Sequence, residues 1–315
     1  MDKIQLIEVK SEIGAGTRGA SMGIDALKIA ALDFRSKLFK NLPSTEVPDE
    51  NEWLFQPFGS PYAKRLEGVV HMQEKVAQTV ATVLKQGDFP IVLSGDHSNA
   101  GGTIAGIKKM YPKAKLGVIW IDAHADMHTP YTSPSGNVHG MPLAAAMGID
   151  NIEKKANSPD EKTIKLWEQL KNVGVSSPHI QPEDLVFIAL RDFEQQEDYL
   201  IKKHRIKVVP VSEIRRKGVD KICRNTLDHL KNCDYIYISF DVDSMDASIS
   251  KGTGTPVLNG INEREAADIV LCLIQNEKIC CFEITEINPT LDKENLMAEN
   301  AFEILQKVVN QLRLG

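Results

Sequence analysis

The stretch Leu116-Gly117-Val118-Ile119-Trp120-Ile121-Asp122-Ala123-His124-Ala125-Asp126 is an apolar run that ends directly in an acidic cluster. The arrangement recurs where Ile91-Val92-Leu93 precedes Ser94-Gly95-Asp96-His97-Ser98, and where Tyr237-Ile238-Ser239-Phe240 precedes Asp241-Val242-Asp243. Short apolar runs that alternate with helical patterns are typical of buried parallel strands. Because ligands bind beyond the carboxyl ends of strands in open α/β sheets, we expect the three clusters to face one crevice.

The remainder of the chain continues this alternation and defines the expected fold. The expected strands are Gln5 to Val9, Pro90 to Leu93, Leu116 to Ile121, Leu185 to Leu190, Lys207 to Pro210, Tyr235 to Phe240 and Lys278 to Ile284. Helices are expected from Leu66 to Leu84, from Glu263 to Gln275 after a capping-box pattern, and from Glu294 to Leu312. The pattern predicts an α/β protein with three layers, α/β/α, around a mostly parallel central sheet. The polar stretch Asp150 to Pro182 is expected to be a surface excursion with a short helix.

Composition limits the class of protein. The chain has 315 residues, of which 42% are hydrophobic, and no shift in composition marks a boundary, so we expect one domain over residues 1–315. The net charge of -6 argues against nucleic acid or an anionic membrane surface as a partner. Five cysteines without ligand spacing are expected to be reduced and structural. No apolar run approaches the roughly 20 residues of a membrane span, so a cytoplasmic location is expected.

The acidic clusters have the composition of a metal site. Alternation along an extended backbone would direct Asp122, His124 and Asp126 to one side, and Asp241 and Asp243 likewise. Carboxylates this close repel one another unless a cation holds them. One such cluster can be a solvated turn, but three clusters at strand ends are not explained in that way. Two imidazoles, many carboxylates and no thiolate suit a pair of hard divalent cations such as Mn²⁺.

These motifs carry a family resemblance. The clusters at residues 94–98, 122–126 and 239–243, together with Gly254-Thr255-Pro256 and Glu286-Ile287-Asn288-Pro289, resemble those of the arginase-like ureohydrolases and occur in the same order. The segment Ser135-Gly136-Asn137-Val138-His139-Gly140 resembles the substrate loop of the arginase branch. The resemblance implies hydrolysis of L-arginine to L-ornithine and urea by attack of a metal-bridging hydroxide on the guanidinium carbon.

The resemblance also implies roles for individual residues. One Mn²⁺ would be held by His97, Asp122, Asp126 and Asp241, and the second by Asp122, His124, Asp241 and Asp243. Asp126 would orient the hydroxide and pass on its proton, and Glu286 would hold the guanidinium. His139 would exchange protons with solvent, although it could instead cap a helix that starts near Gly140. Thr255 would contact the guanidinium side, or could serve as a turn residue before Pro256.

The substrate end departs from the family pattern. Ser135 and Asn137 match residues that contact the α-carboxylate, but His128 stands where many arginases have Asn. Glu194 replaces the usual Asp of the loop that binds the α-ammonium, and Glu197 is retained; the alternative for both acids is a solvated face at the start of a helix. Acids for an ammonium and hydroxyl or amide donors for a carboxylate suit an amino-acid substrate.

Other activities remain possible within this resemblance. Agmatine, formimidoylglutamate or another guanidino acid is the alternative substrate, and a catalytically silent metal-binding relative is the alternative class. The zinc deacetylase branch of the fold would need fewer acidic ligands. The resemblance further implies a small guanidino substrate as partner and a homo-oligomer, trimer or hexamer.

Overall fold

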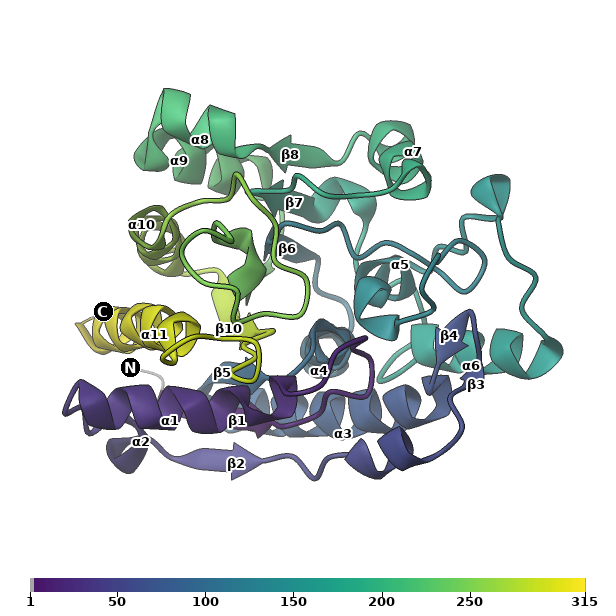
Figure 1. Ribbon diagram of the computed structural model, residues 1–315. Coiled ribbons are helices and arrows are strands. Elements are labelled where there is room, and N and C mark those ends of the chain that lie inside the picture. Colours follow the sequence, from purple (N-terminus) through teal and green to yellow (C-terminus); the bar gives the residue numbers. More distant parts are fainter. Residues whose placement is uncertain (1–2, 315) are drawn as a thin grey trace.

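The computed structural model describes residues 3–314, which build one mostly buried parallel sheet covered on both faces (Figure 1). Within these residues the sheet has eight strands in the order β2-β1-β5-β10-β9-β6-β7-β8, and each neighbouring pair is parallel. The strands are β1 (Ile4–Val9), β2 (Ser44–Glu46), β5 (Phe89–Ser94), β6 (Leu116–Ile121), β7 (Leu185–Ile188), β8 (Lys207–Val209), β9 (Tyr235–Asp241) and β10 (Ile279–Thr285). The predicted α/β class and parallel sheet are confirmed.

Helices form the two outer layers. They are α1 (Gly23–Asp33), α2 (Leu38–Asn41), α3 (Leu66–Lys85), α4 (Ala100–Met110), α5 (Pro142–Met147), α6 (Glu161–Lys171), α7 (Gln195–His204), α8 (Val211–Lys217), α9 (Val219–His229), α10 (Glu263–Ile274) and α11 (Leu296–Leu314). Buried side chains of α1, α2 and α8 to α11 share one apolar cluster, and those of α3 to α7 share the other. The three predicted layers are therefore present.

Alternation along the strands explains why both layers adhere to the sheet. In β6, Ile119 and Ile121 belong to the first cluster, whereas Val118 and Trp120 belong to the second. Every residue of this strand is buried, so apolar side chains are required on both faces. Burial of apolar surface at about 25 cal/mol per Å² makes this two-sided packing the main source of stability. The continuous apolar run before Asp122 reflects that requirement.

Several elements differ from the sequence prediction. The strand β2 and the hairpin of β3 (Gly59–Ser60) and β4 (Ala63–Lys64) were not expected, because they are short and β2 is polar and exposed. The strand β7 ends at Ile188 rather than Leu190. The short helix expected in the excursion exists as α6, but the excursion is not confined to the surface, because Trp167 is fully buried and its Nε1 donates to Asp150.

The order of the strands determines where the acidic clusters lie. The strands β5, β10, β9 and β6 are consecutive neighbours, and all run in the same direction. Their carboxyl ends therefore lie along one edge of the sheet, where residues 94–98, 122–126, 241–243 and 286 follow them. Among the residues that the structure describes, no helix is both long and apolar enough to cross a membrane.

Candidate active site

Six predicted metal ligands converge into two adjacent groups beyond β5, β6 and β9. The Nδ1 atom of His97 lies 3.1 Å from Asp122 Oδ2, 3.0 Å from Asp126 Oδ2 and 3.1 Å from Asp241 Oδ2. The Nδ1 atom of His124 lies 2.9 Å from Asp243 Oδ2 and 3.5 Å from Asp122 Oδ1. Asp122 thus presents one oxygen to each histidine, which is the arrangement expected of a carboxylate between two ions.

Turns, and not an extended backbone, bring these side chains together. The strand β6 ends at Ile121, and the Oδ1 atom of Asp122 then accepts a hydrogen bond of 2.6 Å from the backbone of His124. Asp241 accepts in the same way from the backbone of Asp243, at 2.8 Å, at the start of a short 3-10 turn. Asp126 has a φ of 49°, a left-handed conformation that also excludes simple alternation. The predicted convergence is confirmed, but the alternation offered as its cause was wrong.

Two residues that sequence reasoning missed hold the ring of His97. Its Nε2 atom lies 2.8 Å from Ser239 Oγ, and its ring stacks on Trp120 with centroids 4.0 Å apart and planes 6° apart. These contacts turn Nδ1 toward the three aspartates. The signal for Ser239 was present in the sequence, because it is a polar residue within the otherwise apolar run of β9.

The electrostatics of this group favour a bound cation. Burial and the charge of Asp122 raise the pKa of Asp126 to about 6. Burial, Asp243 and Asp122 likewise raise the pKa of Asp241 well above its usual value. His97 Nδ1 and Asp122 Oδ2 are buried and make no hydrogen bond of acceptable geometry. A buried excess of carboxylates is costly unless a positive charge compensates it, and a set of nitrogen and oxygen donors without sulfur fits hard divalent ions.

Glu286 and His139 form a pair beside the candidate metal centre. Glu286 follows β10 with a φ of 66°, and its Oε1 atom accepts from the backbone of His97 at 2.9 Å and lies 3.0 Å from His139 Nδ1. Burial opposes the charge of His139, but Glu286 outweighs it and raises the pKa of His139 to about 9. The N-cap residue of α5 is Met141, and its side chain makes no cap hydrogen bond. The side chain of His139 therefore serves Glu286 and not a helix cap.

Within residues 3–314, the second carboxylate oxygen of Glu286 has no hydrogen-bond partner. Its Oε2 atom is buried without a hydrogen bond, although the residue lines the pocket described below. Thr255, which also lines this pocket, donates its hydroxyl to Asp243 Oδ2 at 3.2 Å. A free carboxylate oxygen beside two candidate metal positions is suited to a planar cationic group with paired N–H donors.

The hairpin of β3 and β4 supports the loop that contains Ser135 and Asn137. The backbone of Lys64 donates to the Gly136 carbonyl at 2.7 Å, and its Nζ atom lies 3.3 Å from Asn137 Oδ1. Gly136 has a φ of 70°, and a Cβ atom there would lie 1.9 Å from the carbonyl oxygen of Pro61. Only glycine fits this contact.

His128, Glu194 and Glu197, which were expected to contact different ends of an amino acid, contact one another. His128 Nε2 lies 2.9 Å from Glu194 Oε2 and 3.5 Å from Glu197 Oε2. The hydrogen bond from His128 lowers the pKa of Glu194 to about 2, whereas burial raises the pKa of Glu197 to about 8. Because the side chain of Glu197 is only 3% exposed, the solvated-face interpretation is wrong for this residue.

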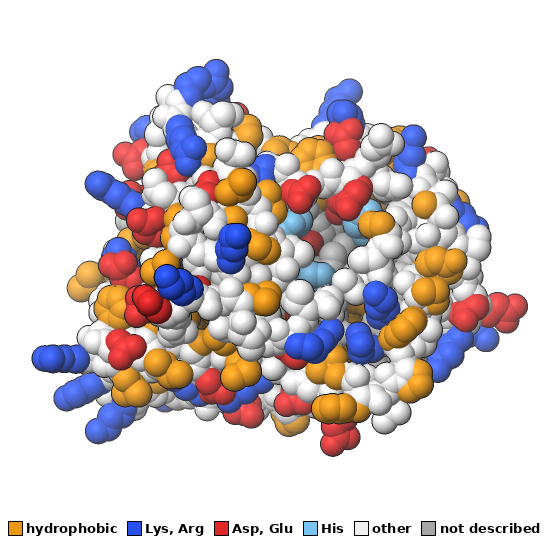
Figure 2. Space-filling model, viewed as in Figure 1, with side chains coloured by type: hydrophobic (Ala, Val, Ile, Leu, Met, Phe, Trp, Pro, Cys, Tyr) orange, Lys and Arg blue, Asp and Glu red, His pale blue; other side chains and the backbone are white. Residues whose placement is uncertain are grey.

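One pocket of about 150 Å³ joins all these groups. Its lining includes the predicted residues His97, His124, Asp126, His128, Ser135, Asn137, His139, Glu194, Glu197, Asp241, Asp243, Thr255 and Glu286. Asp122 is fully buried beneath it. Figure 2 shows the hollow, with histidines inside and acidic side chains on its upper rim.

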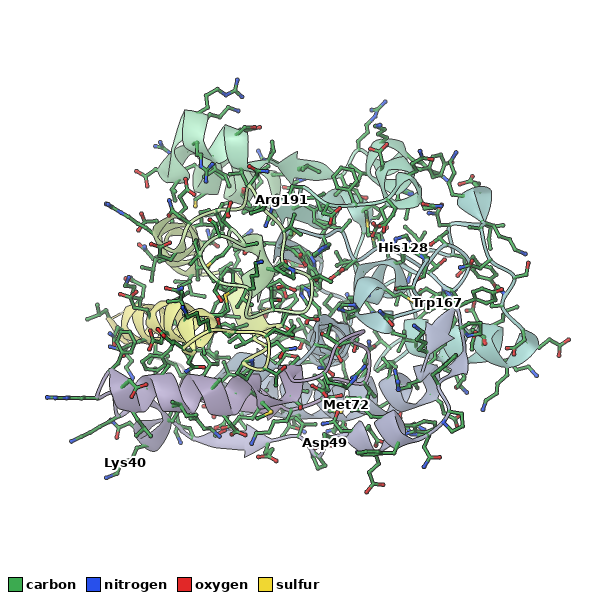
Figure 3. The ribbon with its side chains drawn as sticks, in the orientation of Figure 1. Lys40, Asp49, Met72, His128, Trp167 and Arg191 are labelled. Carbon is green, nitrogen blue, oxygen red and sulfur yellow. The ribbon has the colours of Figure 1, made fainter. Side chains whose placement is uncertain are left out.

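Arg191, labelled in Figure 3, connects the segment that follows β9 to the loop near Thr255. The sequence did not reveal this role. Its guanidinium donates to backbone carbonyls in three segments: the residues just before Arg191 in the sequence, the residues that follow β9, and the loop near Thr255. The acceptors are Ala189, Asp243, Ser244, Met245, Val257 and Leu258, at 2.8 to 3.3 Å. The neighbouring Asp192 lies 3.8 Å from His124 Nε2. Arg191 thus fixes the backbone that follows β9, which contains the candidate ligand Asp243.

Comparison with known proteins agrees with this geometry. The Arginase family model matches residues 2–310. The arginase of Bacillus subtilis (strain 168) is 37% identical over 314 residues, covering 99% of both chains. The solved arginase of Bacillus caldovelox has a TM-score of 0.82 at 33% identity, and that of Entamoeba histolytica in complex with L-ornithine has 0.82 at 26% identity, each over 98% of both chains. The chain therefore belongs to the arginase family and is a ureohydrolase that acts on guanidino substrates.

Proposed function

We propose that the protein binds two Mn²⁺ and hydrolyses L-arginine to L-ornithine and urea. The observation that carries this proposal is the pair of histidine Nδ1 atoms that face four buried aspartates, next to the free oxygen of Glu286. His97, Asp122, Asp126 and Asp241 would hold one ion, and Asp122, His124, Asp241 and Asp243 the other. Two bound cations would lower the pKa of a shared water and supply hydroxide near neutral pH.

Glu286 would position the guanidinium. Its Oε1 atom is already held by the backbone of His97 and by His139, so Oε2 is the atom left for the substrate. A buried carboxylate binds a guanidinium through charge-assisted N–H donors and so fixes the plane of the electrophilic carbon. The delocalised guanidinium is a poor electrophile, so positioning of this kind contributes much of the rate.

Asp126 and His139 would transfer the protons of the reaction. Asp126 would accept a proton during attack and release it afterwards, because its carboxylate lines the pocket beside the candidate metal positions. The C–N bond to the ornithine nitrogen breaks only if that nitrogen receives a proton. His139 lines the pocket, and its side chain is 18% exposed, so it can exchange protons with solvent while Glu286 holds its Nδ1 atom.

The outer pocket would bind the amino-acid end through Ser135 and Asn137. Both line the pocket and carry donors for a carboxylate, which agmatine lacks. The Entamoeba histolytica arginase was solved with L-ornithine, an α-amino acid. A single domain over residues 1–315, a trimer or hexamer and a cytoplasmic location complete the proposal.

The test is urea release by Mn²⁺-loaded protein with L-arginine and agmatine at equal concentrations, with a metal-stripped sample as control. Turnover of arginine that requires metal and greatly exceeds that of agmatine is expected. Preference for agmatine would contradict the assignment of the carboxylate site, and activity that survives metal removal would contradict the metal centre.

A further inference from the structure

The outer end of the pocket contains an acid, Glu194, that already accepts a hydrogen bond from the protein. Glu194 Oε2 lies 2.9 Å from His128 Nε2, and because a carboxylate can only accept, Nε2 must carry the hydrogen whether the ring is neutral or charged. The other ring nitrogen, Nδ1, lies 3.2 Å from Thr132 Oγ1. Both nitrogens of His128 are therefore used within the protein.

The second acid at this end is also used by the protein. Glu197 Oε1 accepts from the backbone of Met127 at 3.0 Å, and Oε2 accepts from the backbone of Glu194 at 3.1 Å. Its side chain is 3% exposed and supports the first turn of α7. An incoming ammonium would have to compete with two backbone amides at Glu197 and with an imidazole at Glu194.

Donors for a carboxylate, in contrast, are available. The Oδ1 atom of Asn137 is held by Lys64 Nζ at 3.3 Å, and Ser135 Oγ accepts from the backbone of Asn137 at 3.1 Å. Within residues 3–314, neither the Nδ2 atom of Asn137 nor the hydroxyl hydrogen of Ser135 has a protein acceptor. This side of the pocket therefore presents hydrogen-bond donors without partners.

We propose that the pocket selects guanidino substrates by their carboxylate and not by their α-ammonium, because the Nε2–H of His128 already donates to Glu194 and weakens the attraction of that acid for an ammonium. The substrate class is then ω-guanidino carboxylic acids, with or without an α-amino group. This inference rests on the proposed function, since it concerns the substrate of the same site. His128 and Glu194 are the residues that set the selectivity.

Three substrates of matched length test the proposal. They are L-arginine, 5-guanidinopentanoate, which lacks only the α-amino group, and agmatine, which lacks only the carboxylate. We expect kcat/KM for arginine to exceed that for 5-guanidinopentanoate by less than about tenfold, and agmatine to be far poorer than both. A pocket built to bind the ammonium would reject the des-amino substrate much more strongly, because its acids would be left unpaired. An arginine preference above about tenfold would overturn the proposal.

Variants at His128 show whether the contact between His128 and Glu194 sets the substrate preference. His128→Asn, which is too short to reach Glu194, should raise the arginine preference about tenfold by freeing the acid. His128→Gln, whose amide can replace the Nε2–H donor, should keep the low preference of the native protein. The exposed His71→Asn serves as the control. An unchanged preference in a folded His128→Asn variant would assign the pair no role in selectivity.

Binding measurements separate this inference from the proposed function. Calorimetry on the Mn²⁺-loaded protein compares L-ornithine with 5-aminopentanoate, which lacks the α-amino group. Affinities for the two ligands that agree within about tenfold support the inference, even if no substrate yields urea. The absence of urea would overturn only the proposed function. Tighter binding of ornithine by more than that would overturn the inference while leaving urea release intact.

Discussion

The two ends of the pocket differ in how their polar atoms are satisfied. At the inner end, four buried aspartates crowd around two histidines, and within residues 3–314 the buried Oε2 atom of Glu286 has no hydrogen-bond partner. At the outer end, His128, Glu194 and Glu197 bond to one another and to the backbone. A buried excess of carboxylates is costly unless a positive charge compensates it, so the inner end favours a bound cation.

This difference separates catalysis from selectivity. If the inner residues hold metal ions as proposed, almost any change of residue type there should affect metal binding or chemistry. At the outer end, His128, Glu194 and Glu197 satisfy one another, so we expect their identities to change with less effect on the fold and on the proposed metal centre. We expect the largest effects of substitution at the inner end.

The largest effect on metal content and kcat/KM is expected for Asp241→Asn. The amide oxygen can still accept from the backbone of Asp243, so the turn is kept while a negative charge next to His97 is lost. Metal content should fall together with kcat/KM, which we expect to drop by more than about 1000-fold when metal-assisted chemistry is lost. Metal analysis and urea release measure both, with exposed Asp220→Asn as the control. Native metal content in a folded variant would contradict the ligand assignment.

Glu286→Gln should separate chemistry from metal binding. Glu286 contacts the backbone of His97 and the ring of His139, and it is not among the expected ligands. We therefore expect kcat to fall about 100-fold or more, the range for a lost electrostatic contact, while metal content stays native. The exposed Glu303→Gln is the matched control. Loss of metal in Glu286→Gln would instead make Glu286 part of the metal centre.

The inner end was predictable because its signals are local in the sequence. Each acidic cluster follows its apolar run directly, so the strand order alone brings the clusters together. The turns at Asp122 and Asp241 were not predicted, because side-chain hydrogen bonds to the backbone override the alternation of an extended chain. The residues predicted as ligands do converge, although not through the alternation that was given as the reason, and their role as ligands stays a prediction.

The outer end was less predictable because its contacts are distant in the sequence. His128 and Glu194 are 66 residues apart and lie outside the helices and strands, so nothing local indicated that they pair. The hairpin that supports Asn137 was missed for a related reason, since β3 and β4 have two residues each and no apolar run. Family resemblance supplied the residues at this end, and only the structure supplied their partners.

A smaller effect concerns the pH dependence of stability in the metal-stripped protein. The folded pKa of His139, about 9, lies above the unfolded value of 6.5, so its pair with Glu286 stabilises the fold below pH 6.5 and this stabilisation is lost as pH rises through 9. The contribution is at most about 3 kcal/mol at 1.36 kcal/mol per pKa unit.

Denaturant unfolding of the metal-stripped native and Glu286→Gln proteins at pH 6, 7.5 and 9 measures the contribution of the His139–Glu286 pair to the free energy of unfolding. The difference between their free energies of unfolding should shrink as the pH rises. A difference that is constant over this range would show that His139 does not gain its charge from Glu286 on folding.

The smallest effect is expected at the outer end, for Ser135→Ala. Ser135 is exposed, and its hydroxyl would donate to the substrate carboxylate, so water can replace much of the lost contact. A loss of about 1 kcal/mol corresponds to a rise of about fivefold in KM for L-arginine, with kcat within about twofold. Steady-state urea release measures both constants, and exposed Ser212→Ala on α8 is the control. A fall in kcat with unchanged KM would join Ser135 to the chemistry of the inner end and remove the division between the two.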